Sequence, residues 1–303
     1  MHRSPTIHPK ITVCIVTYNR DQDLLRSLNH LRESEFNDFE VLVVDNGLSS
    51  FLPSLLRQIG LQQPLRLVQA NENKGCANLN LLFPIAEGEV IACFDDDSYP
   101  AKECLGRVWE LFKNRPSLGM IGFKMHVPET GEPWHDPWWN PNDMSPRPTV
   151  YCPGCGLAFR NDPRLPDELC IPDIISQAHE LSMAAEITRL GLEIEFHPEC
   201  IAYHPDTTLG YVGKKAEAGN LNQLKFLCRY GDIVTIFLVM LTQAIRLISG
   251  NPNNAKYAML YILSVRRKPL KSRHIRRFHS LISWNTHPRL HFMIRKHPLS
   301  TFT

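Results

Sequence analysis

Apolar and polar positions alternate along the first third of the chain in a pattern that predicts strands joined by helices. Four short runs rich in apolar and β-branched residues predict buried strands, at 10–16, 39–44, 65–68 and 89–94. Leucines at helical spacing predict a helix after the first strand, at Leu24, Leu25, Leu28 and Leu31. A further helix is expected over 76–86. This order predicts an α/β fold with a Rossmann-like, doubly wound and mostly parallel sheet.

Each predicted strand is followed by polar residues that can contact a ligand. These residues are Thr17, Tyr18, Asn19 and Arg20 after the first strand, Asp45 and Asn46 after the second, Lys74 within 71–75 after the third, and Asp95, Asp96 and Asp97 after the fourth. Polar residues often follow strands simply because loops are solvated. Ligands of such sheets, however, bind beyond the carboxyl ends of the strands. Four polar strand ends at one edge therefore favour a nucleotide-like ligand.

The chain has neither of the glycine-rich loops that commonly hold phosphate groups. No Gly-x-Gly-x-x-Gly follows the first strand, and Gly-x-x-x-x-Gly-Lys-Ser/Thr does not occur. A phosphate ligand would then need another counter-charge, and a divalent cation held by carboxylates can supply it. Because Mg2+ and Mn2+ prefer oxygen ligands, Asp95–Asp97 predicts a site for Mn2+ or Mg2+. The alternative is an acidic surface turn.

Charge is unevenly distributed, although the formal net charge is only +2. Residues 233–303 contain twelve of the 33 Lys and Arg, and no Asp or Glu. Apolar residues recur at helical spacing over 233–248, but the uncharged run 233–245 is shorter than the roughly 20 residues that a spanning helix needs. With the basic cluster at 266–277, this pattern favours docking on an anionic membrane surface. The alternative is a helical pair packed on the body of the protein, with a solvated basic end.

The length of 303 residues and the 43% of hydrophobic residues are enough for one large core or two domains. We expect an N-terminal tail at 1–9, a domain at 10–215 and a basic helical extension at 216–303; the domain would divide into a nucleotide-binding half, 10–100, and an acceptor half, 101–215. The first residues lack the apolar stretch of a secretory signal, and the nine cysteines lie mostly in apolar runs. These features predict a cytoplasmic protein that docks on the inner face of the membrane. Nucleic acid is not an expected partner, because no recognisable binding module is present.

Residues 126–150 predict a long loop, with six prolines and three tryptophans, Trp134, Trp138 and Trp139. Long loops in compact domains are often functional, and exposed aromatic rings can stack on sugars. An acceptor site and simple anchoring of the loop are both consistent with this composition. Farther along, the alternation over 192–204 predicts an edge strand that ends at His204.

The ordered set of motifs resembles the family 2 glycosyltransferases, which have the GT-A fold. The matching segments are 15–20, 43–46, 71–75, 94–97, 154–156 and 189–191, and they cover roughly residues 10–205. The resemblance implies inverting transfer of a hexose-like sugar from a UDP or dTDP donor to a saccharide or lipid-linked acceptor, as in polysaccharide biosynthesis. The alternative is a catalytically impaired relative that serves as a nucleotide-binding or scaffolding module.

The resemblance also implies roles for the donor-side residues. Thr17 and Tyr18 would lie against the nucleobase, and Asp45 would bind its edge. The remaining donor contacts would come from Asn19, Arg20, Asn46, Lys74, Asp95 and Asp96. The metal ligands would be Asp97 as the principal one, Asp95 shared with the ribose, and His204.

The resemblance places the catalytic base and the acceptor later in the chain. Glu180 occupies the position where the family generally has an aspartate base, and His179 is the second candidate. An ordinary first-turn glutamate, favoured by the helix dipole, is the other interpretation of Glu180. Gly154 and Gly156 would line the acceptor side.

Overall fold

The computed structural model describes residues 8–134, 144–150, 152–174, 176, 178–205, 214–248, 261 and 267–271. The chain divides into two compact units, Met1–Tyr211 and Val212–Thr303. Each unit is described by itself.

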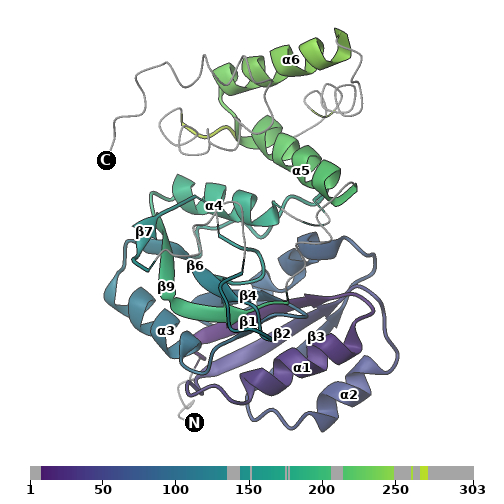
Figure 1. Ribbon diagram of the computed structural model, residues 1–303, viewed down its shortest axis with the longest axis vertical. Coiled ribbons are helices and arrows are strands. Elements are labelled where there is room, and N and C mark those ends of the chain that lie inside the picture. Colours follow the sequence, from purple (N-terminus) through teal and green to yellow (C-terminus); the bar gives the residue numbers. More distant parts are fainter. Residues whose placement is uncertain are drawn as a thin grey trace, which may run out of the picture. The chain divides into compact units, whose positions relative to one another are not determined.

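Within the described residues, the first unit is built on a nine-stranded sheet (Figure 1). Its strands are β1 (Ile11–Thr17), β2 (Phe39–Asp45), β3 (Leu65–Gln69), β4 (Val90–Asp95), β5 (Tyr99–Pro100), β6 (Leu118–His126), β7 (Arg147–Pro148), β8 (Leu157–Arg160) and β9 (Glu193–Tyr203). The order is β3-β2-β1-β4-β8-β6-β9-β5, and β7 also pairs with β9. The first four strands are mutually parallel, as are β6 and β9, whereas β8 runs antiparallel between β4 and β6. The predicted mostly parallel α/β sheet is confirmed.

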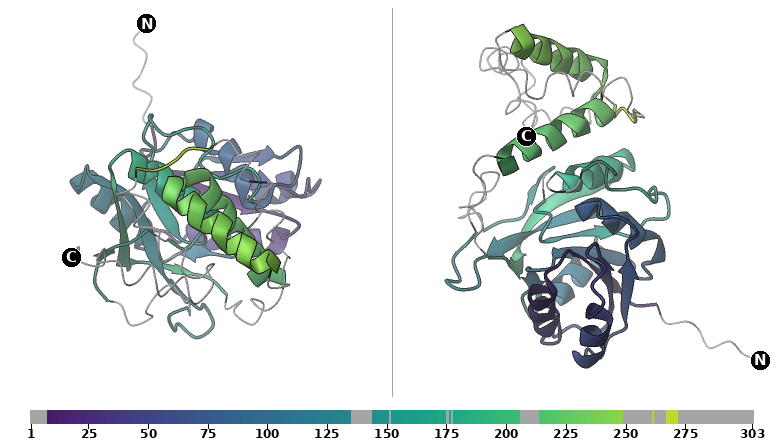
Figure 2. Two further views of the ribbon diagram at one scale, coloured as in Figure 1. Left: turned by 90° about the horizontal axis from the view of Figure 1, so that it is seen from above. Right: turned by 90° about the vertical axis from the view of Figure 1, so that its right-hand side faces the viewer.

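Helices cover both faces of this sheet. The α-helices of the first unit are α1 (Asp21–Leu31), α2 (Leu52–Gln58), α3 (Cys104–Asn114) and α4 (His179–Arg189). Side chains of α1, α2 and α3 share one apolar core with β1, β2, β4 and β6. In the right-hand view of Figure 2, α4 lies across the sheet from α1 and α2.

The helix α1 is held by the leucines that the sequence pattern singled out. Leu24, Leu28 and Leu31 are at most 1% exposed. Full burial of each such side chain stabilises the fold by about 1.5–3 kcal/mol. Because α1 begins four residues after β1 ends, this packing fixes Arg20 at the carboxyl edge of the sheet.

Two of the predicted elements differ in the structure. Residues 76–86 were expected to form one helix, but they form two 3-10 segments, η1 (Gly75–Leu81) and η2 (Phe83–Ile85). Pro84 has no N–H to donate to an α-helical turn, so a continuous helix is interrupted there. The strand β9 is not an edge strand, because β6 pairs with one of its sides and the two-residue strands β5 and β7 with the other.

The second unit contains α5 (Lys214–Tyr230) and α6 (Ile233–Ile248). Asp232 caps α6, since its Oδ1 accepts the N–H of Thr235 at 2.9 Å. Apolar side chains of α6 are exposed, with Ile233 at 76% and Phe237 at 64%. Among the helices that the structure describes, none is both long enough and apolar enough to cross a membrane.

Candidate functional site

The three aspartates lie in a tight turn at the carboxyl end of β4. The Asp95 N–H donates to Ser98 Oγ at 2.8 Å, and that hydroxyl donates to the carbonyl of Cys155, also at 2.8 Å. The turn is therefore pinned to the segment that leads into β8. Asp95 is half-buried at the rim, whereas Asp96 and Asp97 are buried. A solvated acidic surface turn does not describe this arrangement.

Arg20 clamps two of the three carboxylates. Its Nη1 donates to Asp96 Oδ1 at 2.8 Å, and its Nη2 donates to Asp97 Oδ2 at 2.6 Å. Thr17 Oγ1 donates to the other oxygen of Asp96 at 2.9 Å. Burial raises the pKa of Asp96 to about 7 although Arg20 opposes the shift. The chain thus supplies its own cation to Asp96 and Asp97, and Thr17 positions Asp96.

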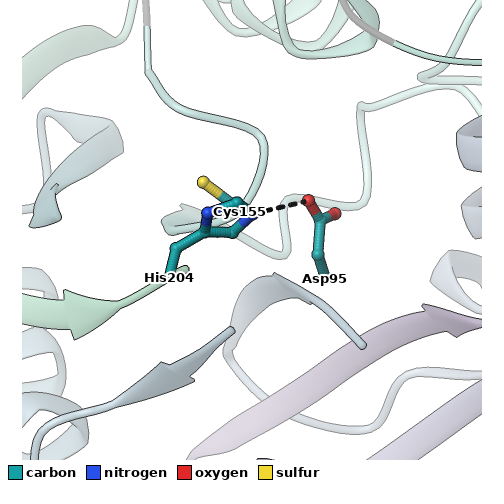
Figure 3. Close-up of side chains that lie close together, drawn as sticks. All are labelled: Asp95, Cys155 and His204. Atoms are coloured by element: carbon teal, nitrogen blue, oxygen red, sulfur yellow. Dashed lines mark ion pairs between the residues drawn. The ribbon is translucent and has the colours of Figure 1, made fainter. Parts of the chain in front are cut away.

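His204 and Cys155 complete a cluster with ligands for a metal (Figure 3). The His204 Nε2 lies 3.9 Å from Asp95 Oδ2 and 3.5 Å from Asp97 Oδ1. Ligand atoms of Asp95, Cys155 and His204 all lie within 4.8 Å of one another. Oxygen, imidazole nitrogen and thiol sulfur together form a donor set that fits a divalent transition metal. The structure thus brings together the three predicted metal ligands, and it adds Cys155, which the sequence reasoning missed.

Asp45 organises the loop after β2. It is 1% exposed, and its two carboxylate oxygens accept the N–H groups of Gly47 and Ser49, each at 2.7 Å. A side chain at Gly47 would collide with Asn19, whose φ of 53° lies in the left-handed region. Tyr18 is 51% exposed at the same edge. The ends of β1 and β2 therefore meet closely, with an accessible aromatic ring beside them.

Asn46 ties this edge to the segment after β3. Its side-chain nitrogen donates to the carbonyl of Gly75 at 3.2 Å, and its side-chain oxygen accepts from Asn78. Lys74 is exposed, with its Nζ 3.4 Å from Glu72. The polar residues after β1, β2 and β3 thus lie along one edge of the sheet. Asp45 and Asn46 fix the backbone of the neighbouring loops by side-chain hydrogen bonds.

The candidate base region begins at a strained residue. Ala178 has a φ of 64° and immediately precedes α4. Glu180 lies in the first turn and is 5% exposed, and its Oε2 is 3.3 Å from His179 Nδ1. Burial lowers the pKa of His179 to about 4, so its imidazole is neutral near pH 7. The ring packs on Gly154, where an added Cβ would lie 2.5 Å from Cε1.

The pKa of the Cys76 thiol is influenced by both the acidic turn and the candidate base. Burial raises the pKa of its thiol, and the carboxylates of Asp95 and Glu180 raise it further. The sequence gave no indication that the two carboxylates influence the Cys76 thiol, because Cys76 is one apolar-flanked cysteine among nine.

The predicted acceptor-side residues are placed in part. Trp134 packs against the core, and its ring centroid lies 5.5 Å from that of His204. Gly156 faces Met125 so closely that a side chain there would collide with its sulfur. Trp138 and Trp139 lie outside the described residues.

The part of the chain that forms this edge of the sheet is similar to known proteins. Residues 12–158 match the family model described as glycosyl transferase family 2. This part of the chain, just under half of it, is similar to that family. The matched segment includes the acidic turn and Cys155, whereas Glu180 and His204 lie beyond it.

Several glycosyltransferases resemble the chain in sequence or fold. An uncharacterized glycosyltransferase of Nostoc sp. is 31% identical over 37% of this chain and 35% of its own length. A beta-monoglucosyldiacylglycerol synthase of Trichormus variabilis is 26% identical over 41% of this chain and 28% of its own. The chain thus spans about a third of the length of these curated relatives. The mannosyltransferase PcManGT of Pyrobaculum calidifontis has a TM-score of 0.52 and 18% identity, over 99% of this chain and 83% of its own. The fold is that of the GT-A glycosyltransferases.

Proposed function

We propose that this protein transfers a sugar from a nucleoside diphosphate donor, of the UDP or dTDP type, to a saccharide or lipid-linked acceptor with inversion. The observation that carries the proposal is the convergence of Asp95, Asp97 and His204 at the carboxyl end of β4, in a GT-A fold. The relatives support the chemical class: one is named a beta-monoglucosyldiacylglycerol synthase, and PcManGT is described in complex with GDP-Man and Mn2+.

On the donor side, Asp95, Asp97 and His204 would hold Mn2+ or Mg2+. When bound, such a metal supplies positive charge that stabilises the departing diphosphate. Tyr18 offers an exposed ring to the nucleobase. Asp45 would position the loop after β2 for donor binding, because its carboxylate accepts a backbone N–H of that loop. Lys74 is exposed and can approach a phosphate from the segment after β3.

On the acceptor side, Glu180 would be the general base. The acceptor oxygen attacks the anomeric carbon while the bond from that carbon to the diphosphate oxygen breaks. The hydroxyl proton passes to the Glu180 carboxylate, and the electron pair leaves with the nucleoside diphosphate. The position in the first turn of α4 suits an ionised carboxylate. The neutral His179 is the second candidate for accepting the proton.

A panel of nucleotide sugars with Mn2+, assayed for donor hydrolysis and transfer, tests this function. Glu180→Gln should lower turnover by about 10²–10⁴-fold, the usual contribution of a general base, and leave nucleotide binding intact. Glu186→Gln is the matched control, because this residue is equally buried on the same helix and pairs with Arg189 at 3.6 Å. Nucleotide binding without turnover in the wild type would favour the catalytically impaired module. Absence of binding to every nucleotide would reject both.

We also propose that the second unit docks on the cytoplasmic surface of an anionic membrane. Several apolar side chains of α6 are exposed, with Ile233 at 76%, Val234 at 60% and Phe237 at 64%. The basic residues of 266–277 follow in sequence. Exposed apolar residues combined with nearby basic ones favour the interface of anionic lipids. A lipid-linked acceptor would be found there.

A further inference from the structure

The segment before β8 brings a thiol to the acidic turn. The strands β4 and β8 pair antiparallel, with Cys93 opposite Leu157. Continued by two residues on each strand, this register sets Asp95 opposite Cys155, and residues that face each other in an antiparallel pair project to the same side. Ser98 holds this juxtaposition, since its Oγ accepts from the Asp95 N–H and donates to the Cys155 carbonyl.

We propose that Cys155 is a further ligand of the bound metal, which adds a sulfur beside the oxygen of Asp95 and the nitrogen of His204. This assignment rests on the proposed function, in which the same edge holds a divalent cation. The ligand atoms of all three lie within 4.8 Å of one another (Figure 3). Metal bonds of about 2.0–2.3 Å place tetrahedral ligand atoms about 3.3–3.8 Å apart. Side-chain movements of about 1 Å therefore close the site.

His204 is oriented as a metal ligand. A carbonyl only accepts hydrogen bonds, so the contact at 2.7 Å between His204 Nδ1 and the Pro205 carbonyl means that Nδ1 carries the proton. The lone pair is then on Nε2, the nitrogen that faces Asp95. Metal-binding histidines typically donate their other N–H in this way, which fixes the tautomer and the ring.

Asp95 is the carboxylate that a metal can take with the least competition. Arg20 already pairs with Asp96 and Asp97 at 2.8 and 2.6 Å. Of the residues that the structure describes, His204 alone lies within ion-pair distance of the Asp95 carboxylate. A cation that binds Asp95 leaves Oδ2 of Asp97 paired with Arg20, while Oδ1 of Asp97, 3.5 Å from His204 Nε2, faces the site.

A thiolate changes which metals bind best. Carboxylate and water ligands suit Mg2+ and Mn2+, whereas thiolate favours Zn2+ and other thiophilic ions. The order of affinity without nucleotide is therefore expected to be Zn2+ and Co2+ above Mn2+, and Mn2+ above Mg2+. Replacement of Cys155 by Ser keeps the shape of the side chain and removes the soft ligand.

Titration of the full chain with Co2+ tests this assignment, because a cobalt–thiolate bond produces a charge-transfer band in the near ultraviolet. Cys155→Ser should lose the band and bind Co2+ at least about 10-fold more weakly, since even the supporting partners of metal ligands change affinity by 10–100-fold. Its affinity for Mg2+ should change by less than about 3-fold. Cys152→Ser is the matched control, being a buried cysteine of the same segment outside the cluster. Circular dichroism establishes that both variants fold.

The outcomes separate this inference from the proposed function. Co2+ binding without the band in the wild type, or no Co2+ binding, overturns the assignment of Cys155, and so does loss of the band in Cys152→Ser. Nucleotide-sugar turnover with Mn2+ in those cases leaves the proposed function standing. A band that depends on Cys155 in a protein that turns over no nucleotide sugar supports the ligand and rejects the function.

Discussion

Arg20 neutralises two buried carboxylates, and its replacement by Gln should destabilise the first unit. The guanidinium lies 2.8 Å from Asp96 and 2.6 Å from Asp97, and these two carboxylates are 6% and 7% exposed. Without it, both carboxylates would remain buried beside Asp95 with no guanidinium to offset their charge. Among the described residues, the other ring within ion-pair distance of Asp97 is that of His204, at 3.5 Å.

The expected loss of stability depends on how deeply Arg20 and the two carboxylates are buried. Loss of one partner of a fully buried ion pair costs about 3–5 kcal/mol. The Arg20 side chain is 43% exposed, so water already screens part of its attraction, and we expect a loss of about 1–3 kcal/mol. For a unit of this size, that corresponds to a fall in Tm of roughly 3–10 °C. The loss should be largest above pH 7, because burial holds the pKa of Asp96 at about 7 and its protonated form needs no cation.

Thermal unfolding at pH 8 in the presence of a chelator measures this effect. The control is Arg26→Gln, an exposed arginine of α1 that lies 3.2 Å from Asp23 and should contribute less than about 0.5 kcal/mol. Mn2+ should restore more of the Tm in Arg20→Gln than it adds to the wild type, because the cation takes over the charge of the guanidinium. Equal Tm values for the Arg20 and Arg26 variants would refute the reasoning.

Three further perturbations address other parts of the molecule. His179→Asn should reduce the loss of stability as pH falls from about 6.5 to 4. The folded protein keeps this imidazole neutral down to a pKa of about 4, whereas the unfolded chain takes up the proton at a higher pH. This difference corresponds to about 3 kcal/mol in the free energy of unfolding, which urea unfolding measures. A slope equal to that of the wild type would contradict this. Gly154→Ala should displace the His179 ring, whose Cε1 would lie 2.5 Å from the new methyl, and lower transfer at least about tenfold with unchanged nucleotide binding by calorimetry. Phe237→Glu should reduce flotation with anionic liposomes, and recovery equal to the wild type would argue against docking through α6.

Local patterns carry much of the fold and of the site. The strand boundaries of β1, β2 and β4 follow from runs of apolar residues, since these strands are buried on both faces, whereas β3 is only half-buried. Because parallel strands end at one edge, the residues after them were predictable as neighbours. The short strands β5 and β7 were not predictable, since two residues carry no periodicity, and their pairing moved β9 from an edge to the interior of the sheet.

The sequence by itself determined the α/β order, the acidic turn and the polar edge around it, because each depends on residues close together in the chain. Only the tertiary structure decided which side chains of that edge contact one another. The clamp of Arg20 on Asp96 and Asp97 joins residues more than seventy positions apart. The approach of Cys155 to Asp95 depends on β8 entering antiparallel beside β4, a pairing that no local pattern encodes. Contacts between distant segments are set by packing and register, so the partners of each charge became visible only in the folded chain.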